Sequence, residues 1–349
     1  MLRPCSDTLR GLILFKNVMA YRIGADWTIS LTQLEEALDT YRFVECSPSQ
    51  DKSVGWAEPR GQAHGPLVEA VGGQWILKLQ IETKAVPGSV VRRKADERIQ
   101  EIEATTGRKP GKKESREIRE DIVHTLLPLA FSKQSQVMVW IDMDSRLLLT
   151  DAASQGKSDE VITALVRVLG GLPLTLLQTT VSAQSAMSQW LLTENEDDLP
   201  PAFSVERECV LKSTNEDQAV VKFTRHLLAT DEVRKHVMEG KLPTQLALSW
   251  EGKASFVLTE TLVLKKVTYL DGVMEDAGGD EDKFDADVIL STGTLGPLLA
   301  DLIDALGGEM SFITTPGASA PTSATALAKP AASPTGVASS EDLSDSPFV

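Results

Sequence analysis

Two groups of acidic side chains have a spacing at which carboxylates can share a Mg²⁺ ion. The first is Asp142, Asp144 and Asp151, and the second is Asp280, Glu281, Asp282, Asp285 and Asp287. A metal-dependent nuclease would need such carboxylates to converge on one or two ions. The first group falls on a predicted hairpin, where Asp commonly makes turns, and the second lacks the Gly and the terminal Glu of a calcium loop. We therefore interpret both groups as turn and surface carboxylates and expect no metal site, and a nuclease stays open as an alternative.

Other catalytic patterns are incomplete. The segment 107–113 comes nearest to a phosphate-binding loop, but it has three residues between its glycines where that loop has four, and Lys113 stands in place of the hydroxyl residue. The histidines have neither HxH nor HExxH spacing, and they are His64, His124, His226 and His236. We expect neither an enzyme nor a cofactor.

Basic side chains on predicted strands indicate phosphate contacts instead. In the segment 220–228, strand alternation places Phe223 and Arg225 on one face and Lys222 on the other. Further lysines flank a strand, follow Phe131 or end a helix, and they are Lys78, Lys84, Lys133 and Lys241. Each such cation can neutralise a phosphate of DNA. Ordinary solvated charge is the alternative, and the spacing by itself leaves both open.

An aromatic side chain follows a proline that marks a helix end. In LLPLAFSK, Phe131 comes after Pro128 and next to a charged segment. A core position and an apolar plug into a partner subunit both fit this place in the chain.

The composition limits the class of protein. The chain has 349 residues, of which 42% are hydrophobic, so it can bury a substantial core. Its formal net charge is −15, which excludes a protein that meets phosphate with its whole surface and leaves a local basic patch. Cys5, Cys46 and Cys209 are far apart and predict neither a zinc module nor a disulfide framework, as in a reducing cytoplasm. No apolar run approaches the ~18 residues that span a bilayer, and we expect no signal peptide and no membrane contact.

Hydrophobic periodicity predicts alternating strands and helices. In the first half we expect strands at 12–23, 74–86, 136–143, 146–153 and 173–179, helices at 30–43 and 158–169, and a mostly irregular segment at 47–66. Ser30 or Thr32 can cap the first helix. In the second half we expect strands at 208–213 and 218–228, a helix at 230–241, an antiparallel meander at 244–250, 253–259 and 262–270, and a strand followed by a helix within 284–308.

Residues 88–131 have a different character. Between 92 and 119 they carry ten basic and six acidic side chains, with Gly107, Pro110 and Gly111 in the middle. We predict two charged helices joined by a turn, which form a protruding hairpin.

The predicted elements indicate an α+β fold with mixed and antiparallel sheets. We assign residues 1–10 to an N-terminal extension, 11–87 and 132–178 to a central domain, 88–131 to the helical hairpin, 179–310 to a base domain, and 311–349 to a disordered tail rich in Ala, Pro, Ser and Thr.

Short motifs follow one another from Phe15 to Glu309. They are Phe15-Lys16-Asn17, Tyr21-Arg22, Gly55-Trp56, Glu82-x-Lys84, Leu126-Leu127-Pro128-x-Ala130-Phe131-Ser132, Trp140-Ile141-Asp142, Leu169-Gly170-x-Leu172-Pro173, Leu246-Ala247-Leu248-x-Trp250, Phe284-Asp285-Ala286-Asp287 and Leu306-Gly307-Gly308-Glu309. In this order they resemble the bacterial recombination-associated protein RdgC family.

The resemblance implies a ring-shaped homodimer, closed by two different two-fold contacts, whose hole accommodates duplex DNA with little sequence preference. It also implies a cytoplasmic, nucleoid-associated protein that opposes or modulates the RecA recombinase by occupying DNA. Arg225 and Lys222 match basic positions of the family that face the hole. Phe131 matches the aromatic at the contact between the helical tips, which resembles a gate.

Two positions depart from the family pattern. Leu129 stands where a basic residue is common, and Gln245 stands where a Lys can occur. Both departures predict weaker DNA binding than is usual in the family. The alternative function is a protein-interaction scaffold, in which the hairpin binds a protein and DNA contact is incidental.

Overall fold

The structure is a computed structural model that describes residues 14–195, 199–215, 218–270 and 280–310, without the side chains of 280–282. The N-terminal extension expected at 1–10 and the tail expected at 311–349 lie outside the described residues. The described residues all belong to one compact unit, which ends at Met310.

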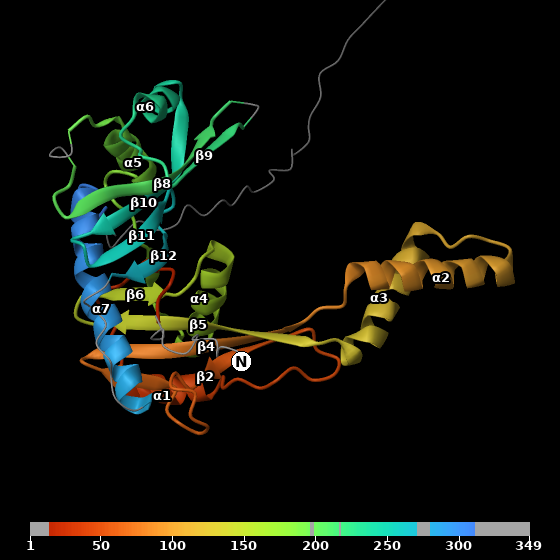
Figure 1. Cartoon of the computed structure of the whole chain (residues 1–349). Helices are drawn as coiled ribbons and strands as arrows, with labels where there is room; N and C mark the ends of the chain where they lie inside the picture. The colour runs from red at the N-terminus through yellow and green to blue at the C-terminus, as the bar shows by residue number, and fades with distance from the viewer. Residues whose placement is uncertain (1–13, 196–198, 216–217, 271–279, 311–349) are drawn as a thin grey trace, which may run out of the picture. The chain divides into compact units, whose positions relative to one another are not determined.

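A seven-stranded antiparallel sheet is built from the first half of the chain (Figure 1). Its strands are β1 (Met19–Ile23), β2 (Lys52–Ala57), β3 (Val68–Val71), β4 (Gln74–Lys84), β5 (Ser132–Asp142), β6 (Leu147–Thr150) and β7 (Leu174–Leu176). The order is β2-β4-β5-β6-β1-β7, and β3 pairs with β4. The apolar face expected in β4 is present, because Leu77, Leu79 and Ile81 are buried, but the alternation in exposure is wrong, because Lys78 and Glu82 are buried as well.

Two helices cover one face of this sheet, α1 (Leu31–Asp39) and α4 (Gln155–Leu169). Leu34 and Leu38 of α1 and Leu165 of α4 are fully buried in the same cluster as the apolar side chains of β4 and β5. Ser30 caps α1, as predicted: its hydroxyl accepts from the backbone N–H of Gln33 at 3.2 Å, and the Gln33 side chain accepts from the N–H of Ser30 at 3.0 Å. This reciprocal pair satisfies two backbone donors at the helix start.

The second half of the chain forms a five-stranded antiparallel sheet in the order β12-β11-β10-β8-β9. Its strands are β8 (Phe203–Ser213), β9 (Val220–Thr224), β10 (Lys241–Trp250), β11 (Ala254–Thr259) and β12 (Leu264–Tyr269). The predicted meander is confirmed as β10, β11 and β12. Two helices, α5 (Ala183–Leu192) and α6 (Asp231–Met238), contact β10.

A long helix, α7 (Asp280–Ala305), joins the two sheets into one core (Figure 1). Leu295 and Leu298 are buried in a cluster that contains Trp140 of β5 and Leu248 of β10. The predicted boundary near residue 178 therefore falls between two sheets that share this core. By length and composition, 283–305 could cross a membrane. Its burial among both sheets is the arrangement of a core helix.

Two helices are inserted between β4 and β5, beyond the last pair of that ladder, Lys84 with Ser132. They are α2 (Gly88–Thr106) and α3 (Lys112–Leu126), which contact each other, and the 3₁₀ turn η1 (Leu127–Leu129) follows. Gly107 ends α2 with a φ of 70°, a left-handed conformation that glycine adopts without strain. Within α3 no residue is fully buried, so its surface is available for contacts with other molecules.

Several elements differ from the expectation. The strand expected at the start of 284–308 is wrong, because α7 is continuous from Asp280 to Ala305. Val288, Leu295 and Leu302 are buried at helical spacing, and this tertiary packing outweighs the strand preference of β-branched residues. The segment 47–66 is mostly irregular, as expected, but it contains the strand β2, which was not expected, and neither β3 nor α5 was expected.

Candidate nucleic-acid interface

One face of the five-stranded sheet carries Lys212, Lys222, Lys265 and Lys266, and we call this surface the basic sheet face. On β8, Cys209 and Leu211 are buried, whereas the alternating positions Glu208, Val210 and Lys212 lie on the other side. Lys222 of the edge strand β9 pairs with Val210, so it shares that side. The helices α5 and α6 contact β10, whose buried side chains lie on the opposite face. Lys212, Lys222 and Lys266 are exposed.

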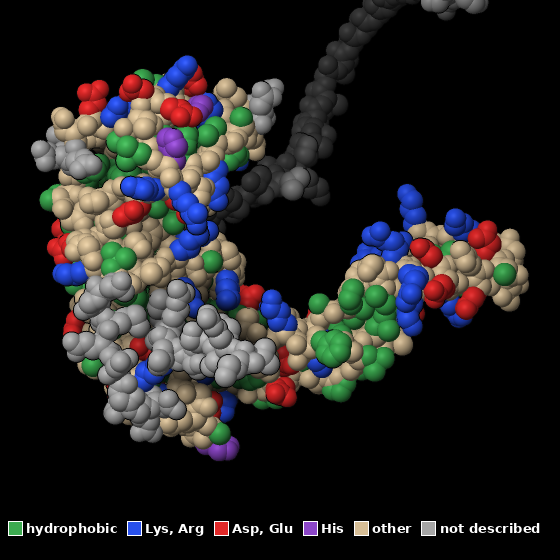
Figure 2. Space-filling view, in the orientation of Figure 1, with side chains coloured by type: hydrophobic (Ala, Val, Ile, Leu, Met, Phe, Trp, Pro, Cys, Tyr) green, Lys and Arg blue, Asp and Glu red, His purple; other side chains and the backbone are tan. Residues whose placement is uncertain are grey.

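The lysines of β12 are placed by a β-bulge. Lys265 pairs with Val257 of β11, and the register then shifts before Thr268. Lys266 lies in this irregularity with a φ of 53°, which turns its side chain out of the ladder. Its ammonium group reaches the carboxylate of Glu208, which lies on β8. Figure 2 shows Lys and Arg side chains gathered over this sheet.

Two arginines lie where β8 and β9 diverge. The last pair of this ladder is Glu208 with Thr224, so the next residues outward are Arg207 and Arg225. Arg225 has a φ of 56°, and the N–H of His226 donates to the carbonyl of Arg207 at 3.2 Å. Both arginines are exposed, and neither is ion-paired with a described carboxylate. Like charges side by side without an acidic partner favour binding of an anion such as phosphate.

The strand alternation expected for 220–228 ends at Thr224. Phe223 is buried, but Arg225, which was expected on the same face, is exposed, because the backbone after β9 turns left-handed at this residue. The structure therefore brings Lys222 and Arg225 together at one sheet edge.

The remaining predicted basic residues do not lie on this surface. Lys84 donates to the carbonyl oxygens of Cys46 at 3.2 Å and Ser47 at 3.0 Å. Lys133 is exposed on β5 of the seven-stranded sheet, where it pairs with Thr83 of β4. Because Thr83 and Lys84 are consecutive residues, the side chains of Lys133 and Lys84 point to opposite faces of that sheet.

Of the other predicted basic residues, Lys241 is held by neighbouring side chains and Lys78 is buried. The ammonium group of Lys241 lies 2.8 Å from Nδ1 of His236 and 3.2 Å from Glu239. Lys78 is only 9% exposed, and burial lowers the pKa of its ammonium group. Its strand face is therefore not the solvated polar face that the sequence predicts.

Apolar side chains lie exposed beside α3. Phe131 is 95% exposed and Leu129 is 77% exposed. Figure 2 shows hydrophobic side chains gathered at this end of the helix pair. A core role for Phe131 is thus absent in the single chain. An exposed phenyl ring of this kind is typical of a contact with another molecule.

The carboxylates singled out for metal chemistry have structural roles. Asp142 accepts from the backbone N–H groups of Asp144 and Ser145, each at 3.0 Å, and shapes the β5–β6 turn. Asp151 accepts from the N–H of Asn17 at 2.8 Å, and burial raises the pKa of its carboxyl group. Asp285 is paired with Arg60 at 2.6 Å. Within the described part of the chain, no three His, Cys, Asp or Glu side chains are grouped to hold a metal ion.

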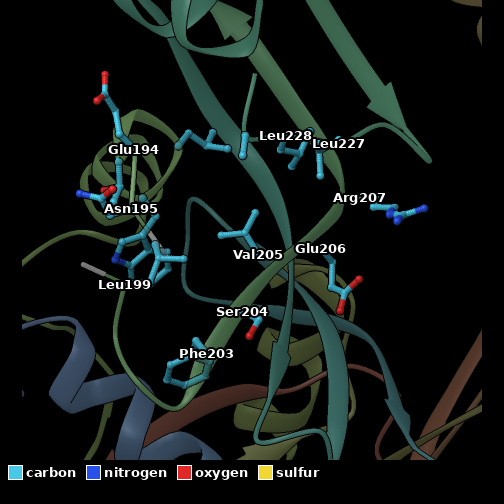
Figure 3. Close-up of a pocket in the computed structure, with 14 residues that line it drawn as sticks. Glu194, Asn195, Leu199, Phe203, Ser204, Val205, Glu206, Arg207, Leu227 and Leu228 are labelled. Carbon is cyan, nitrogen blue, oxygen red and sulfur yellow. The ribbon is translucent and has the colours of Figure 1, made fainter. Parts of the chain in front are cut away.

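A hollow of about 300 Å³ lies between the end of α5, the start of β8 and residues 227–229 (Figure 3). Val205 and Leu199 point toward it, whereas the side chains of Glu206 and Arg207 point to the other side of β8. The described residues that line it include no His or Cys, so they offer neither a nucleophilic thiol nor an imidazole base.

Comparison with known proteins identifies the family. A family model described as "Putative exonuclease, RdgC" matches residues 13–309. The chain is 43% identical over 299 residues to the recombination-associated protein RdgC of Herminiimonas arsenicoxydans, a match that covers 84% of this chain and 98% of that protein. It is 40% identical over 299 residues to the protein of the same name from Bordetella pertussis, with the same two coverages. The chain belongs to the RdgC family.

Sequence reasoning about this RdgC chain missed Lys212, Lys265, Lys266 and Arg207. A signal existed for Lys212, because it follows the alternating buried residues of a predicted strand. For Lys266 and Arg207 there was none, because each lies at a register shift of its strand. Bulges depend on pairing between distant segments and leave little trace in local periodicity.

Proposed function

We propose that this RdgC-family chain binds duplex DNA without sequence preference, through the basic sheet face and the Arg207–Arg225 pair. The observation that supports the proposal most is that Lys222 and Arg225 lie together at one sheet edge, both exposed, on a sheet that also exposes Lys212 and Lys266. Lysine and arginine at such an edge contact phosphates, which position a protein on DNA without reading its bases.

A salt titration tests this function. If about four cations neutralise phosphates, log K should fall by about 0.9 for each of them per unit of log salt, so the affinity should drop roughly a hundredfold between 50 and 200 mM salt. Fluorescence anisotropy with two unrelated random duplexes measures this. An affinity that barely changes with salt would remove the electrostatic basis of the proposal.

We further propose that the protein acts as a homodimer that encircles DNA and restrains RecA-dependent recombination by obstructing the recombinase filament. The support is the family membership and the exposed Phe131, which suits a contact between two copies. Such a protein would be cytoplasmic and associated with the nucleoid. Sizing the protein with circular and linear duplex tests the ring, and a RecA strand-exchange assay on preloaded duplex tests the obstruction.

The proposed mechanism needs no catalysis, since occupancy of the duplex is sufficient. The description of the family model names an exonuclease, so exonuclease activity needs an assay of its own. Plasmid and end-labelled linear duplex are incubated with the protein and Mg²⁺. Degradation that is lost on mutation of Asp142 or Asp151 would replace the binding proposal with an enzymatic one.

A further inference from the structure

Glu208 lies among the lysines of the basic sheet face. One of its carboxylate oxygens is 3.0 Å from the ammonium nitrogen of Lys266 and 3.8 Å from that of Lys222, and its second oxygen is 3.2 Å from Lys266. The side chain of Glu208 is 25% exposed, whereas those of Lys266 and Lys222 are 63% and 58% exposed. One half-buried carboxylate thus holds two exposed cations.

The carboxylate and the two ammonium groups of these ion pairs come from three different strands of the sheet. Glu208 is on β8, Lys222 is on its neighbour β9, and Lys266 is on β12, with β10 and β11 between in the strand order. The β8–β10 and β11–β12 ladders both contain register shifts, and Lys266 lies at the second of them. Such irregularities redirect side chains from the regular ladder. The ion pairs therefore depend on the tertiary fold and are not neighbours along a single strand.

A carboxylate in this position offers the lysines the same partner that DNA would. Both carboxylate and phosphate present anionic oxygens to an ammonium group. A phosphate that contacts Lys222 or Lys266 must share the ammonium group with Glu208 or displace it, and the negative charge of Glu208 repels the phosphate in either case.

We propose that Glu208 is an internal competitor for DNA phosphate. In the free protein it holds Lys222 and Lys266 in place over the sheet, and on binding it gives them up. It therefore positions the DNA-contacting lysines, limits the affinity and reduces the number of phosphates that the sheet neutralises. This inference rests on the proposed DNA-binding function.

The test compares Glu208→Gln with a matched control on the same strand. Glu206→Gln makes the same change in net charge, and Glu206 is exposed with no ion-paired lysine or arginine among the described residues. Figure 3 shows its side chain on the same side of β8 as that of Arg207. The control thus measures the general effect of removing one negative charge near the DNA.

Binding of a random duplex is measured by anisotropy from 50 to 200 mM salt, and folding of each variant is checked by its thermal midpoint. We expect Glu208→Gln to bind roughly three- to tenfold more tightly at low salt than the wild type, since two exposed ion pairs no longer compete. The slope of log K against log salt should become steeper by up to about 0.9, which is one further phosphate. Glu206→Gln should produce less than half of either change.

A second pair of variants tests the coupling to a lysine. In a Lys266→Ala background, Glu208→Gln should gain less affinity than in the wild type, because the lysine that it would release is gone. Equal gains in both backgrounds, or equal behaviour of Glu208→Gln and Glu206→Gln, would overturn the competitor role while wild-type binding stands. Wild-type protein that does not bind duplex at all would overturn the proposed function and this inference with it.

Discussion

Arg225 is presented by its backbone, since its φ of 56° turns the side chain out at the end of β9. We expect Arg225→Glu to weaken duplex binding by about tenfold or more, because a phosphate contact is replaced by repulsion. The loss should be the same for unrelated duplex sequences, since phosphates carry no sequence information. Anisotropy titrations with two duplexes of different sequence measure both points.

Arg167→Glu is the control for this charge reversal. Arg167 is exposed on α4, a helix that covers the seven-stranded sheet, and its guanidinium group stacks on Tyr41 at 4.9 Å. Arg167→Glu should leave binding within about twofold of the wild type, because Arg167 belongs neither to the basic sheet face nor to the arginine pair and salt screens charges that do not contact the DNA. A loss at Arg225 that affects one duplex and spares the other would contradict a phosphate contact.

Gln245 lies within the basic sheet face, because it pairs with Val210 of β8 and with Thr259 of β11. By the family resemblance, a Lys can stand at the position of Gln245. We expect Gln245→Lys to tighten duplex binding by a few-fold and to steepen its salt dependence by about 0.9 per unit of log salt. The same assay measures it, with Gln189→Lys on α5 as the control because that exposed residue belongs to a helix covering the other side of the sheet.

The sequence predicted which positions carry basic or apolar side chains more easily than it predicted the face to which each side chain points. The alternation in 220–228 correctly placed Phe223 and Lys222 on opposite faces, but it could not show that the strand ends before Arg225. Lys78 was expected on a polar face, yet it is nearly buried beside Met138 of β5. Both outcomes depend on which strand lies alongside, and a single strand's periodicity does not contain that information.

Among the elements, β2 is held by a close backbone approach at Gly55. A Cβ atom added there would lie 2.5 Å from the Cα of Phe43 and 2.7 Å from its nitrogen, and the N–H of Phe43 donates to the carbonyl of Trp56 at 2.8 Å. Gly55→Ala should therefore lower the free energy of unfolding by about 1–3 kcal/mol, the usual effect of overpacking. Urea denaturation measures it.

Gly156→Ala is the matched control for this substitution. Nothing lies within 4 Å of a Cβ added at Gly156, which is in the first turn of α4. Alanine should be neutral or stabilise the protein by up to about 1 kcal/mol at this position, because it favours helix. Equal stabilities of the two variants would mean that β2 can shift away from Phe43 without cost.

Elements with strong local signals were predicted correctly, and those defined by tertiary contacts were not. The capped helix at Ser30 and the meander of β10 to β12 follow from local patterns. The segment before Leu295 contains β-branched residues and was expected to be a strand, but its buried stripe packs against both sheets as part of α7. β2 was hidden by the flanking Gly and Pro residues, and its pairing with β4 makes it a strand.

At the scale of the whole molecule, DNA binding must be reconciled with a net charge of −15. Charges separated by more than about 10 Å are largely screened at moderate salt, so the local surface decides whether a phosphate is attracted. The basic sheet face and the arginine pair supply such a surface in a chain with 35 basic and 50 acidic residues. Acidic surface elsewhere would disfavour DNA in other orientations, which is consistent with the proposed enclosed binding site.

The proposed ring gives Phe131 a testable role, because its 95% exposed ring contributes nothing to the core of the single chain. Phe131→Ala should therefore leave the thermal midpoint unchanged, and the second two-fold contact of the proposed ring should keep the protein dimeric in analytical ultracentrifugation. The substitution should shorten retention on closed circular duplex at high salt, where only a closed ring is held. Val44→Ala, at another residue that is 72% exposed, is the control for loss of a surface apolar group. Retention on circular DNA that matches the wild type would show that ring closure does not depend on Phe131.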